Sequence, residues 1–427
     1  MPDKIHDLIG VGFGPSNLAL AIALHESASP VQARFLEARP AFAWHPDMMI
    51  DGADMQVSFL KDLVSLRDPT SGFSFLNYLH HKGRLERFIN RKTFFPSRHE
   101  YNDYLGWAAA RLGPVCVYDQ RVTAVEAVEK NGAVDLLAVT AQDAQGHETQ
   151  RFARNLVLAP GGQPFWPDCF ADQRGGPAVI HACDYITARQ ARLKPGLRIA
   201  VLGGGQSAAE IFADLAAHPA APQLDLILRG HAIRPADDSA FVNEIFGIGY
   251  TDRLFALPPE ARSAFLRDFA ATNYSVADAD LIARLYELLY EQEVQGGTRL
   301  RLLRETRVAS VRSQGAGVVL EMVGGAEAAP QSEAYDLVIL ATGYRRALSE
   351  TVLAGLRPWM TDSQPGRDYR LPMAPRFAPQ IFVQGYSEAT HGLSDTLLSV
   401  LPARAQEIAA ALAPPSDAAR RPVLAAE

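Results

Sequence analysis

Two glycine clusters combine residue types and spacing that suit phosphate binding. The first reads Gly10-x-Gly12-x-Gly14-Pro15, and the second reads Gly203-Gly204-Gly205-Gln206-Ser207-Ala208. Glycines let a backbone turn sharply and approach a pyrophosphate, which then lies at the N-terminus of the following helix. Either cluster alone could be a plain tight turn, but each follows an apolar run and precedes an alanine-rich segment. This context favours two dinucleotide sites.

The residues that end the next apolar runs differ in charge. Glu37 follows the first cluster and could accept a hydrogen bond from a ribose 2′-hydroxyl. Arg229 follows the second cluster, and its guanidinium would bind a ribose 2′-phosphate, which a carboxylate would repel. We therefore predict the adenosine of FAD in the first site and that of NADPH in the second. A solvated strand end is the alternative interpretation of Arg229.

The elements that must position these residues follow from the hydrophobic pattern. The first unit is predicted as a strand at residues 7–10, a helix at 17–24 and a strand at 33–37. The second is predicted as a strand at 197–202, a helix that ends near residue 218 and a strand at 224–229. Apolar runs around a helix are typical of parallel βαβ units that are buried on both faces. Two such units predict an α/β fold with two dinucleotide-binding (Rossmann-like) domains. A segment with helical periodicity predicts a smaller, mainly helical insertion.

The order of these patterns sets the expected domain limits. A strand ending in Ala341-Thr342-Gly343 resembles the segment 155–162, and it is expected to bring the chain back between the domains. The predicted parts are an FAD-binding domain (1–162 and 331–412), an NADPH-binding domain (163–235 and 295–330), a helical insertion (236–294) and a disordered tail (413–427).

Composition excludes several classes of protein. The 427 residues carry a formal net charge of −7, which disfavours nucleic acid or an anionic membrane as a partner. Cys116, Cys169 and Cys183 form no CxxC pair, so a disulfide framework or dithiol redox centre is not expected. We also expect no targeting segment, no membrane helix and no metal site. The expectation is a soluble cytoplasmic protein, with a homo-oligomer left open.

Four further segments resemble the signature of the N-hydroxylating flavin monooxygenase family, the lysine/ornithine N-monooxygenases. They are Met55–Ser71, Asp237–Phe246, Thr272–Ser275 and His391–Leu401. The resemblance runs from about residue 6 to about residue 410, with the motifs in the family's order. Within the family the best match is to the L-ornithine N(5)-monooxygenases of hydroxamate siderophore biosynthesis. The resemblance implies FAD and NADPH as cofactors, dioxygen as co-substrate and L-ornithine as substrate.

The resemblance also implies residues that hold the amino acid. Lys61 would pair with the α-carboxylate, for which an ammonium is suited, although a solvated lysine is the ordinary case. Asn243 and Asn273 would bind the head group, which makes the helical insertion 236–294 the substrate-binding part, although isolated asparagines more often cap turns. Ser399 would contact the substrate and the flavin edge. The full predicted substrate set is Lys61, Asn243, Glu244, Ile245, Phe246, Asn273 and Ser399.

Cofactor contacts complete the implied site. Gln56 would lie beside the reactive flavin ring, and with Asn273 it forms the predicted catalytic pair. The predicted FAD residues are Gly10, Gly12, Gly14, Pro15, Glu37, Trp44, His45, Gln56, Val122, Thr396, Leu397 and Leu398. The predicted NADPH residues are Gly203, Gly204, Gly205, Gln206, Ser207, Arg229, Asn273, Tyr274 and Ser275.

Two kinds of alternative function stay open at this point. The first is an N-monooxygenase of L-lysine or another diamine with the same cofactors. The second is of another class, an NADPH-dependent flavoprotein reductase or a redox sensor without turnover. A flavoprotein reductase shares the plan of two dinucleotide-binding domains, although the missing CxxC argues against the disulfide-reducing kind.

Overall fold

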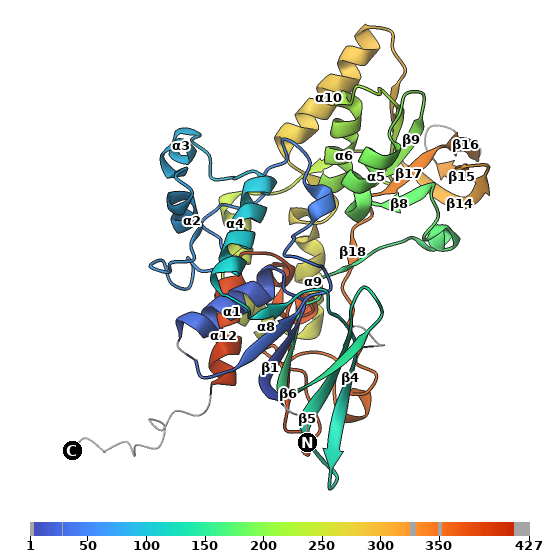
Figure 1. The fold of residues 1–427 in the computed structure, drawn as a ribbon. Coiled ribbons are helices and arrows are strands. Elements are labelled where there is room, and N and C mark those ends of the chain that lie inside the picture. Colours follow the sequence, from blue (N-terminus) through green and yellow to red (C-terminus); the bar gives the residue numbers. More distant parts are fainter. Residues whose placement is uncertain (1–3, 28, 325–329, 349–351, 414–427) are drawn as a thin grey trace.

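A computed structural model describes residues 4–27, 29–324, 330–348 and 352–413 of the chain. Two sheet-containing halves lie one above the other in Figure 1, joined by extended segments and flanked by helices. None of the described helices is long and apolar enough to cross a membrane. The tail expected to be disordered lies, apart from Ala413, outside the described residues.

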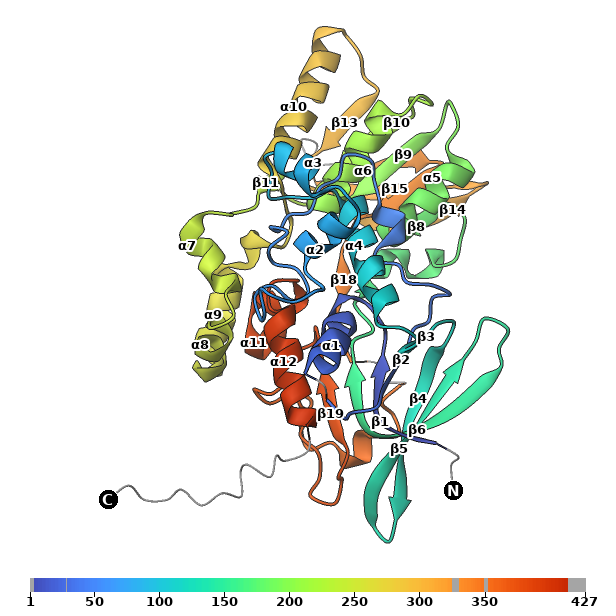
Figure 2. The same ribbon diagram turned by 60° about the vertical axis from the view of Figure 1, so that its left-hand side comes forward.

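The first sheet contains the first glycine cluster and has seven strands in the order β3-β2-β1-β6-β5-β4, with β19 paired to β6. The strands are β1 (Ile5–Val11), β2 (Ala33–Leu36), β3 (Cys116–Val117), β4 (Arg121–Lys130), β5 (Ala133–Gln142), β6 (Glu148–Leu158) and β19 (Gln380–Val383). β1 runs parallel to both β2 and β6, and the β4–β5–β6 part is an antiparallel meander. Helices α1 (Pro15–Glu26) and α12 (Leu401–Leu412) lie side by side on this half (Figure 2).

The second sheet contains the second cluster and is parallel throughout, in the order β13-β10-β9-β17-β8. Its strands are β8 (Val179–His181), β9 (Arg198–Leu202), β10 (Gln223–Ile227), β13 (Leu300–Leu303) and β17 (Leu337–Leu340). Helix α6 (Gln206–Ala217) follows β9 directly, as a βαβ unit requires. The expected fold class of two Rossmann-like units is therefore confirmed.

β17 bears on the expected domain limits. The sequence predicts that the segment from residue 331 belongs to the first domain, but β17 hydrogen-bonds to β9 and β8 in the second sheet. The chain therefore leaves the second sheet after Leu340, later than residue 331. The reason is that the four side chains of β17 are apolar and buried, which suits an inner strand of a parallel sheet. The remaining domain limits stay a proposal.

The expected insertion is mainly helical, with its helices divided between the two halves. It holds α7 (Ala240–Asn243), η4 (Glu244–Phe246), α8 (Tyr250–Ala256), α9 (Pro259–Asp268), η5 (Ala270–Thr272) and α10 (Ala279–Val294). Helices α8 and α9 contact α11 (Glu388–His391) beside the first half, whereas α10 packs against α6 of the second. The segment between α9 and α10 therefore spans the two halves.

Shorter elements connect these parts. The helices are α2 (Phe75–His81), α3 (Leu85–Asn90), α4 (Arg98–Arg111) and α5 (Tyr185–Arg192), with single turns η1 (Pro46–Met48), η2 (Asp168–Gln173), η3 (Ala182–Asp184), η6 (Arg357–Trp359) and η7 (Leu393–Thr396). The strands are β7 (Gln163–Pro164), β11 (Arg234–Pro235), β12 (Val276–Ala277), β14 (Thr306–Gln314), β15 (Gly317–Gly324), β16 (Gln331–Tyr335) and β18 (Tyr344–Arg345). Strands β14 to β16 form a separate antiparallel sheet.

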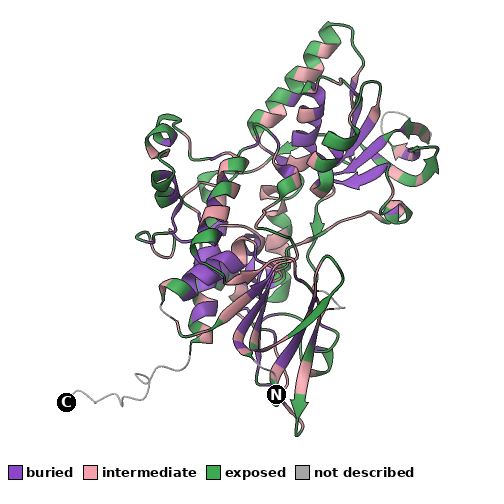
Figure 3. Cartoon of the chain, in the orientation of Figure 1, coloured by how far each residue is buried: buried purple, intermediate pink, exposed green. Residues whose placement is uncertain are grey.

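Burial marks the two sheets and the helices that follow their glycine clusters as the cores of the molecule (Figure 3). Every residue of α1 from Asn17 to Leu24 is buried, because the helix lies between its sheet and α12. Helix α6 is buried from Ala208 to Ala213 for the same reason, beneath α10. Both helix N-termini are thus held firmly where a phosphate would bind.

Candidate active site

A single cavity of about 2730 Å³ is lined by both glycine turns. Gly12, Gly14 and Pro15 line it from the first half, and the backbone from Gly203 to Ser207 lines it from the second. The motif segments around residues 55–61, 272–275 and 396–399 line the same cavity. Residues that are distant in the sequence thus meet at one site that could hold two dinucleotides and a small molecule.

The first glycine turn fits a closely approaching pyrophosphate. Gly12 has φ +82°, and a Cβ there would lie 2.5 Å from the carbonyl oxygen of Ala159, so a larger residue would not fit. The amide of Asn17 holds the turn by donating to the Gly12 carbonyl at 2.7 Å. Glu37 accepts from the Phe13 N–H at 2.8 Å, which fixes its carboxylate at the end of β2. Each carboxylate oxygen can accept more than one hydrogen bond, so Glu37 can also receive a ribose hydroxyl.

The second glycine turn has the same close packing and an opposite charge beside it. Gly203 has φ +149°, and a Cβ there would lie 2.4 Å from the carbonyl oxygen of Ala341. Arg229 lies just after β10 and lines the cavity with an exposed side chain. No carboxylate in the described part of the chain forms an ion pair with it. The free guanidinium suits a phosphate ligand.

Gln206 differs from its expected role as a dinucleotide contact. Its side-chain nitrogen donates to Glu210 and to Asp278, each at 2.9 Å, and its side-chain oxygen accepts from the Asp278 N–H at 2.9 Å. Both amide hydrogens therefore have partners within the protein. Any contact of Gln206 with a dinucleotide would therefore come from its backbone N–H at the start of α6 or from its side-chain oxygen as an acceptor.

The expected substrate residues include polar groups without protein partners. Lys61 is half-buried in the cavity wall, and no carboxylate among the described residues pairs with its ammonium. Burial lowers the pKa of Lys61 below its ordinary value. The hydroxyl of Ser399 is buried in the wall and has no hydrogen-bond partner in the described structure. Asn243 donates to the Asp238 carbonyl at 2.6 Å, which leaves its side-chain oxygen as an acceptor.

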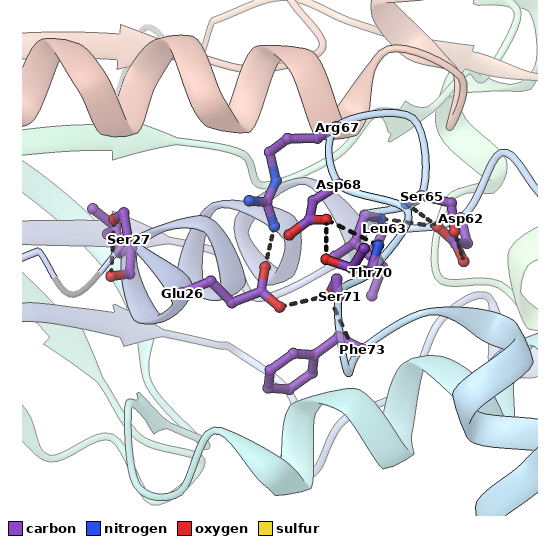
Figure 4. A network of polar contacts seen from close by, with 12 residues as sticks. Glu26, Ser27, Asp62, Leu63, Ser65, Arg67, Asp68, Thr70, Ser71 and Phe73 are labelled. Atoms are coloured by element: carbon purple, nitrogen blue, oxygen red, sulfur yellow. Dashed lines mark hydrogen bonds and ion pairs between the residues drawn. The ribbon is translucent and has the colours of Figure 1, made fainter.

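The turn that presents Lys61 is held by the next residue. Asp62 is buried, and its carboxylate accepts from the backbone N–H groups of Val64 at 2.9 Å, Ser65 at 2.7 Å and Phe75 at 2.7 Å. Figure 4 shows this carboxylate within the polar network that shapes the segment. Burial raises the pKa of Asp62, although its hydrogen bonds oppose that shift. The rigid turn explains how a lysine can be kept facing the cavity.

The loop that carries Asn273 is attached to the C-terminal motif. The hydroxyl of Tyr274 donates to the carboxylate of Glu388 on α11, and both residues line the cavity. Burial raises the pKa of Tyr274 to about 12 and also raises the pKa of Glu388. Ser275 follows with φ +59°, a strained conformation for a residue with a side chain. Asn273, Tyr274 and Ser275 all line the cavity, as expected.

A buried ion pair joins the first glycine turn to the C-terminal motif, and sequence reasoning missed it. Arg404 of α12 is 1% exposed and donates to the Asp395 carboxylate at 2.7 Å and to the Ser16 hydroxyl at 3.1 Å. It also donates to Gln384, which in turn donates to Asn17 at 2.8 Å. Asp395 precedes Thr396 directly, so this network fixes the segment 396–399 relative to the turn. No local sequence signal could have revealed the pairing.

Other predicted FAD residues lie at the cavity wall. Trp44, His45, Gln56 and the run Thr396–Leu398 all line it. His45 has φ +48°, and burial lowers its pKa to about 4, so the imidazole is neutral near pH 7. Its neutral ring can act as a donor at one nitrogen and an acceptor at the other.

The structure does not bring four predicted residues to the cavity: Gly10, Val122, Glu244 and Ile245. Gly10 lies within β1, where a Cβ would lie 2.2 Å from the ring of Phe35, so its role is close packing. Val122 and Ile245 are buried in apolar clusters, and Glu244 is exposed. Of the predicted stretch 243–246, the residues that line the cavity are Asn243 and Phe246. Sequence position beside a motif did not reveal which side chains face inward.

The chain is similar to flavin-dependent amine hydroxylases in both sequence and structure. Residues 4–346 match the family "L-lysine 6-monooxygenase/L-ornithine 5-monooxygenase". An L-ornithine N(5)-monooxygenase from Pseudomonas aeruginosa is 45% identical over 96% of this chain and 94% of its own length. A solved ornithine hydroxylase from the same species has a TM-score of 0.92 at 44% identity, covering 96% of this chain and 99% of that one.

Two further solved structures bear on ligands and substrate. An ornithine N-hydroxylase from Kutzneria sp. 744, with reduced FAD, NADP⁺ and L-ornithine, has a TM-score of 0.89 at 36% identity, covering 96% of this chain and 99% of that one. An L-lysine 6-monooxygenase from Pseudomonas syringae has a TM-score of 0.82 at 32% identity, covering 95% and 99%.

Proposed function

The chain belongs to the L-lysine 6-monooxygenase/L-ornithine 5-monooxygenase family, and on that premise we propose that it hydroxylates the side-chain amine of L-ornithine. The product would be N(5)-hydroxyornithine, a hydroxamate precursor for siderophores or related natural products. The cofactors would be FAD and NADPH, with dioxygen as co-substrate. We also propose a cytoplasmic location, as the cysteine usage favours a reducing compartment.

The observation that carries the proposal is a set of unpaired polar groups in one cavity with both glycine turns. The Lys61 ammonium and the Ser399 hydroxyl have no protein partner among the described residues, yet both are at least half-buried. Leaving such groups unpaired costs free energy unless a ligand meets them. An amino acid supplies the missing carboxylate for Lys61, and this supports an amino-acid substrate.

The cofactor sites fit the donors and acceptors present. Gly12 and the N-terminus of α1 would hold the FAD pyrophosphate, and Glu37 would accept from the adenosine ribose. Arg229 would bind the 2′-phosphate that distinguishes NADPH from NADH. FAD, when bound and reduced by NADPH, supplies the chemistry that activates dioxygen.

The protein's own residues would prepare the amine. Lys61 would pair with the α-carboxylate, and Asn243 and Asn273 would bind the rest of the head group. The side-chain amine must lose a proton before it can act as a nucleophile, and its ordinary pKa resembles the value of about 10.4 for lysine. Removal from water in the cavity lowers such a pKa and so favours the neutral amine.

Gripping the head group gives selectivity for chain length. Lysine is one methylene longer, and in an apolar pocket that difference is worth only about 1–3 kcal/mol. When the head group is fixed, however, the extra methylene of lysine displaces its side-chain nitrogen from the reacting position. A shift of about 1 Å can cost on the order of 100-fold in rate. The higher identity to the ornithine hydroxylase structure, 44% against 32% for the lysine enzyme structure, also favours ornithine.

Product analysis tests the proposal. Purified protein, NADPH and air would be incubated with L-ornithine and L-lysine in parallel, and hydroxylamine product would be measured by mass spectrometry. We expect N(5)-hydroxyornithine from ornithine and little product from lysine. Equal hydroxylation of lysine would favour the diamine alternative. NADPH oxidation that requires a separate electron acceptor would instead indicate a reductase, and a protein without bound flavin would contradict the proposal.

A further inference from the structure

One carboxylate lies between the two predicted cofactor sites and contacts side chains from both. Asp278 precedes α10 and accepts from the side-chain nitrogen of Gln56 at 3.1 Å and from that of Gln206 at 2.9 Å. All three residues line the cavity. Gln56 belongs to the segment that presents Lys61, whereas Gln206 begins the helix after the second glycine turn. Asp278 therefore joins the two halves at the wall of the cavity.

The chemistry of a carboxylate fixes the orientation of both amides. An ionised carboxylate can only accept hydrogen bonds, so each glutamine must turn its NH₂ group toward Asp278. The carbonyl oxygen of Gln56 lies at the other end of that amide, and no described group donates to it. Gln56 thus presents an acceptor rather than a donor to a ligand.

The carboxylate is itself firmly anchored. The Asp278 N–H donates to Gln206 at 2.9 Å, and Gln206 donates to Glu210 at 2.9 Å. Arg98 of α4 then binds both oxygens of Glu210, at 2.7 and 2.9 Å, and this pair is largely buried. These contacts connect α4, through Glu210 and Gln206 of α6, to Asp278. Asp278 has little freedom to release the Gln56 amide.

We propose that Asp278 is a positioning residue that orients the Gln56 amide with its oxygen toward the ligand. The inference rests on the proposed function, in which Gln56 lies beside the flavin ring. Reduced isoalloxazine carries a ring N–H where the oxidised ring carries a bare nitrogen. A fixed acceptor favours the reduced ring, and an amide free to turn would lose that preference. The reduction potential of bound FAD therefore reports the orientation independently of turnover.

The test compares Asp278→Asn with wild type. Asp278 stands at the N-cap of α10 without a side-chain capping hydrogen bond, and asparagine is well tolerated at that position, so α10 should fold. The asparagine amide can donate as well as accept and no longer dictates the Gln56 orientation. We expect the preference for reduced flavin to fall about tenfold, the worth of one hydrogen bond. For a two-electron couple, that fold-change lowers the potential by about 30 mV. N(5)-hydroxyornithine formed per NADPH should fall as well.

Two further variants isolate the mechanism. Glu287→Gln is the matched control, because Glu287 is an exposed acid on the same helix that lies outside the cavity lining, and it should keep the wild-type potential. Asp278→Asn should have no added effect on the potential in a Gln56→Ala background, because Asp278 acts through Gln56. Asp278→Ser, which also caps a helix but is too short to hold the amide, should reproduce the shift if the asparagine variant does not fold.

A wild-type potential in Asp278→Asn and Asp278→Ser would overturn the inference, and so would an undiminished shift in the Gln56→Ala background. These measurements need bound FAD but no ornithine. The potential thus tests the positioning role even if the substrate is another amine. A wild-type protein that binds FAD yet forms no hydroxylated amine would instead contradict the proposed function.

Discussion

The two glycine turns share a positive-φ glycine between a buried strand and the start of a helix, but they differ in what surrounds them. At the first turn, Glu37 is already bonded to the turn's own N–H, and Asn17 and Arg404 tie the turn to the C-terminal motif. At the second turn, Arg229 is exposed and has no ion-pair partner among the described residues. A site assembled from internal partners suits a cofactor that stays bound, whereas an unpaired surface cation suits a cosubstrate that exchanges. The same local motif thus serves two binding modes.

Of the substitutions proposed here, removing the Arg404 side chain should reduce the stability of the first glycine turn most. Arg404→Met leaves Asp395 buried and unpaired, which typically costs about 3–5 kcal/mol. We expect a lower free energy of unfolding and a loss of bound FAD, measured by urea denaturation and by flavin absorbance. Arg370→Met is the control, because Arg370 pairs with Asp368 at the surface, where ion pairs contribute about 0–1 kcal/mol. Equal stability of the two variants would contradict the assigned role of the network.

Matched alanine substitutions should separate the two turns. Gly12→Ala and Gly203→Ala each place a Cβ within 2.5 Å of a backbone oxygen, at a φ that disfavours side chains. We expect Gly12→Ala to lose FAD. Gly203→Ala should keep FAD but bind NADP⁺ weakly, as measured by flavin content and calorimetry. Loss of FAD from both variants would remove the distinction between the turns.

Arg229→Ala should weaken NADPH binding without affecting FAD. Hydrogen bonds to a charged group are worth about 1.5–3 kcal/mol, so the dissociation constant should increase about 10- to 100-fold. The dissociation constant of NADH, which lacks the 2′-phosphate, should hardly change. Arg312→Ala, on an exposed strand outside the cavity, is the control. An equal loss of affinity for both nucleotides would argue against phosphate recognition.

Lys61→Ala should affect the amino acid and neither nucleotide. Losing the pairing with the α-carboxylate should raise the KM for ornithine about 10- to 100-fold, by the same energetic argument. Steady-state kinetics with flavin content measured in parallel would check this. Lys82→Ala removes a surface lysine that pairs with Asp103 and should behave as wild type. An unchanged KM in Lys61→Ala would exclude the assigned role.

The pH dependence of kcat/KM gives the finest test. The ratio should rise from pH 7 toward 9 as the substrate amine loses its proton. It should fall at higher pH, because neutral Lys61 cannot pair with a carboxylate, and burial brings that loss below the ordinary lysine pKa. Lys61→Arg should lack the alkaline decline, since arginine stays charged. A flat profile between pH 7 and 9 would contradict use of the neutral amine.

Local patterns predicted the parts of the site that depend on neighbours in the sequence. Both glycine turns, Glu37 and Arg229 lie where a strand–turn–helix–strand unit must place them, and so the fold class was predictable. The partners of Arg404 and Asp278 were not, because each is brought in by tertiary packing over long sequence separations. Which residues of a motif face inward also depends on packing. The family resemblance named residues 243 to 246, but it could not separate Asn243 and Phe246 from their neighbours.

The central claim is that a cavity between two unlike nucleotide turns holds an amino acid by its head group. The most direct measurement follows isotope-labelled dioxygen into the product with purified protein, NADPH and L-ornithine. We predict one labelled oxygen on the side-chain nitrogen of ornithine, with lysine causing NADPH oxidation but little labelled product. Label that appears in peroxide or water alone, with no labelled ornithine, would contradict the claim.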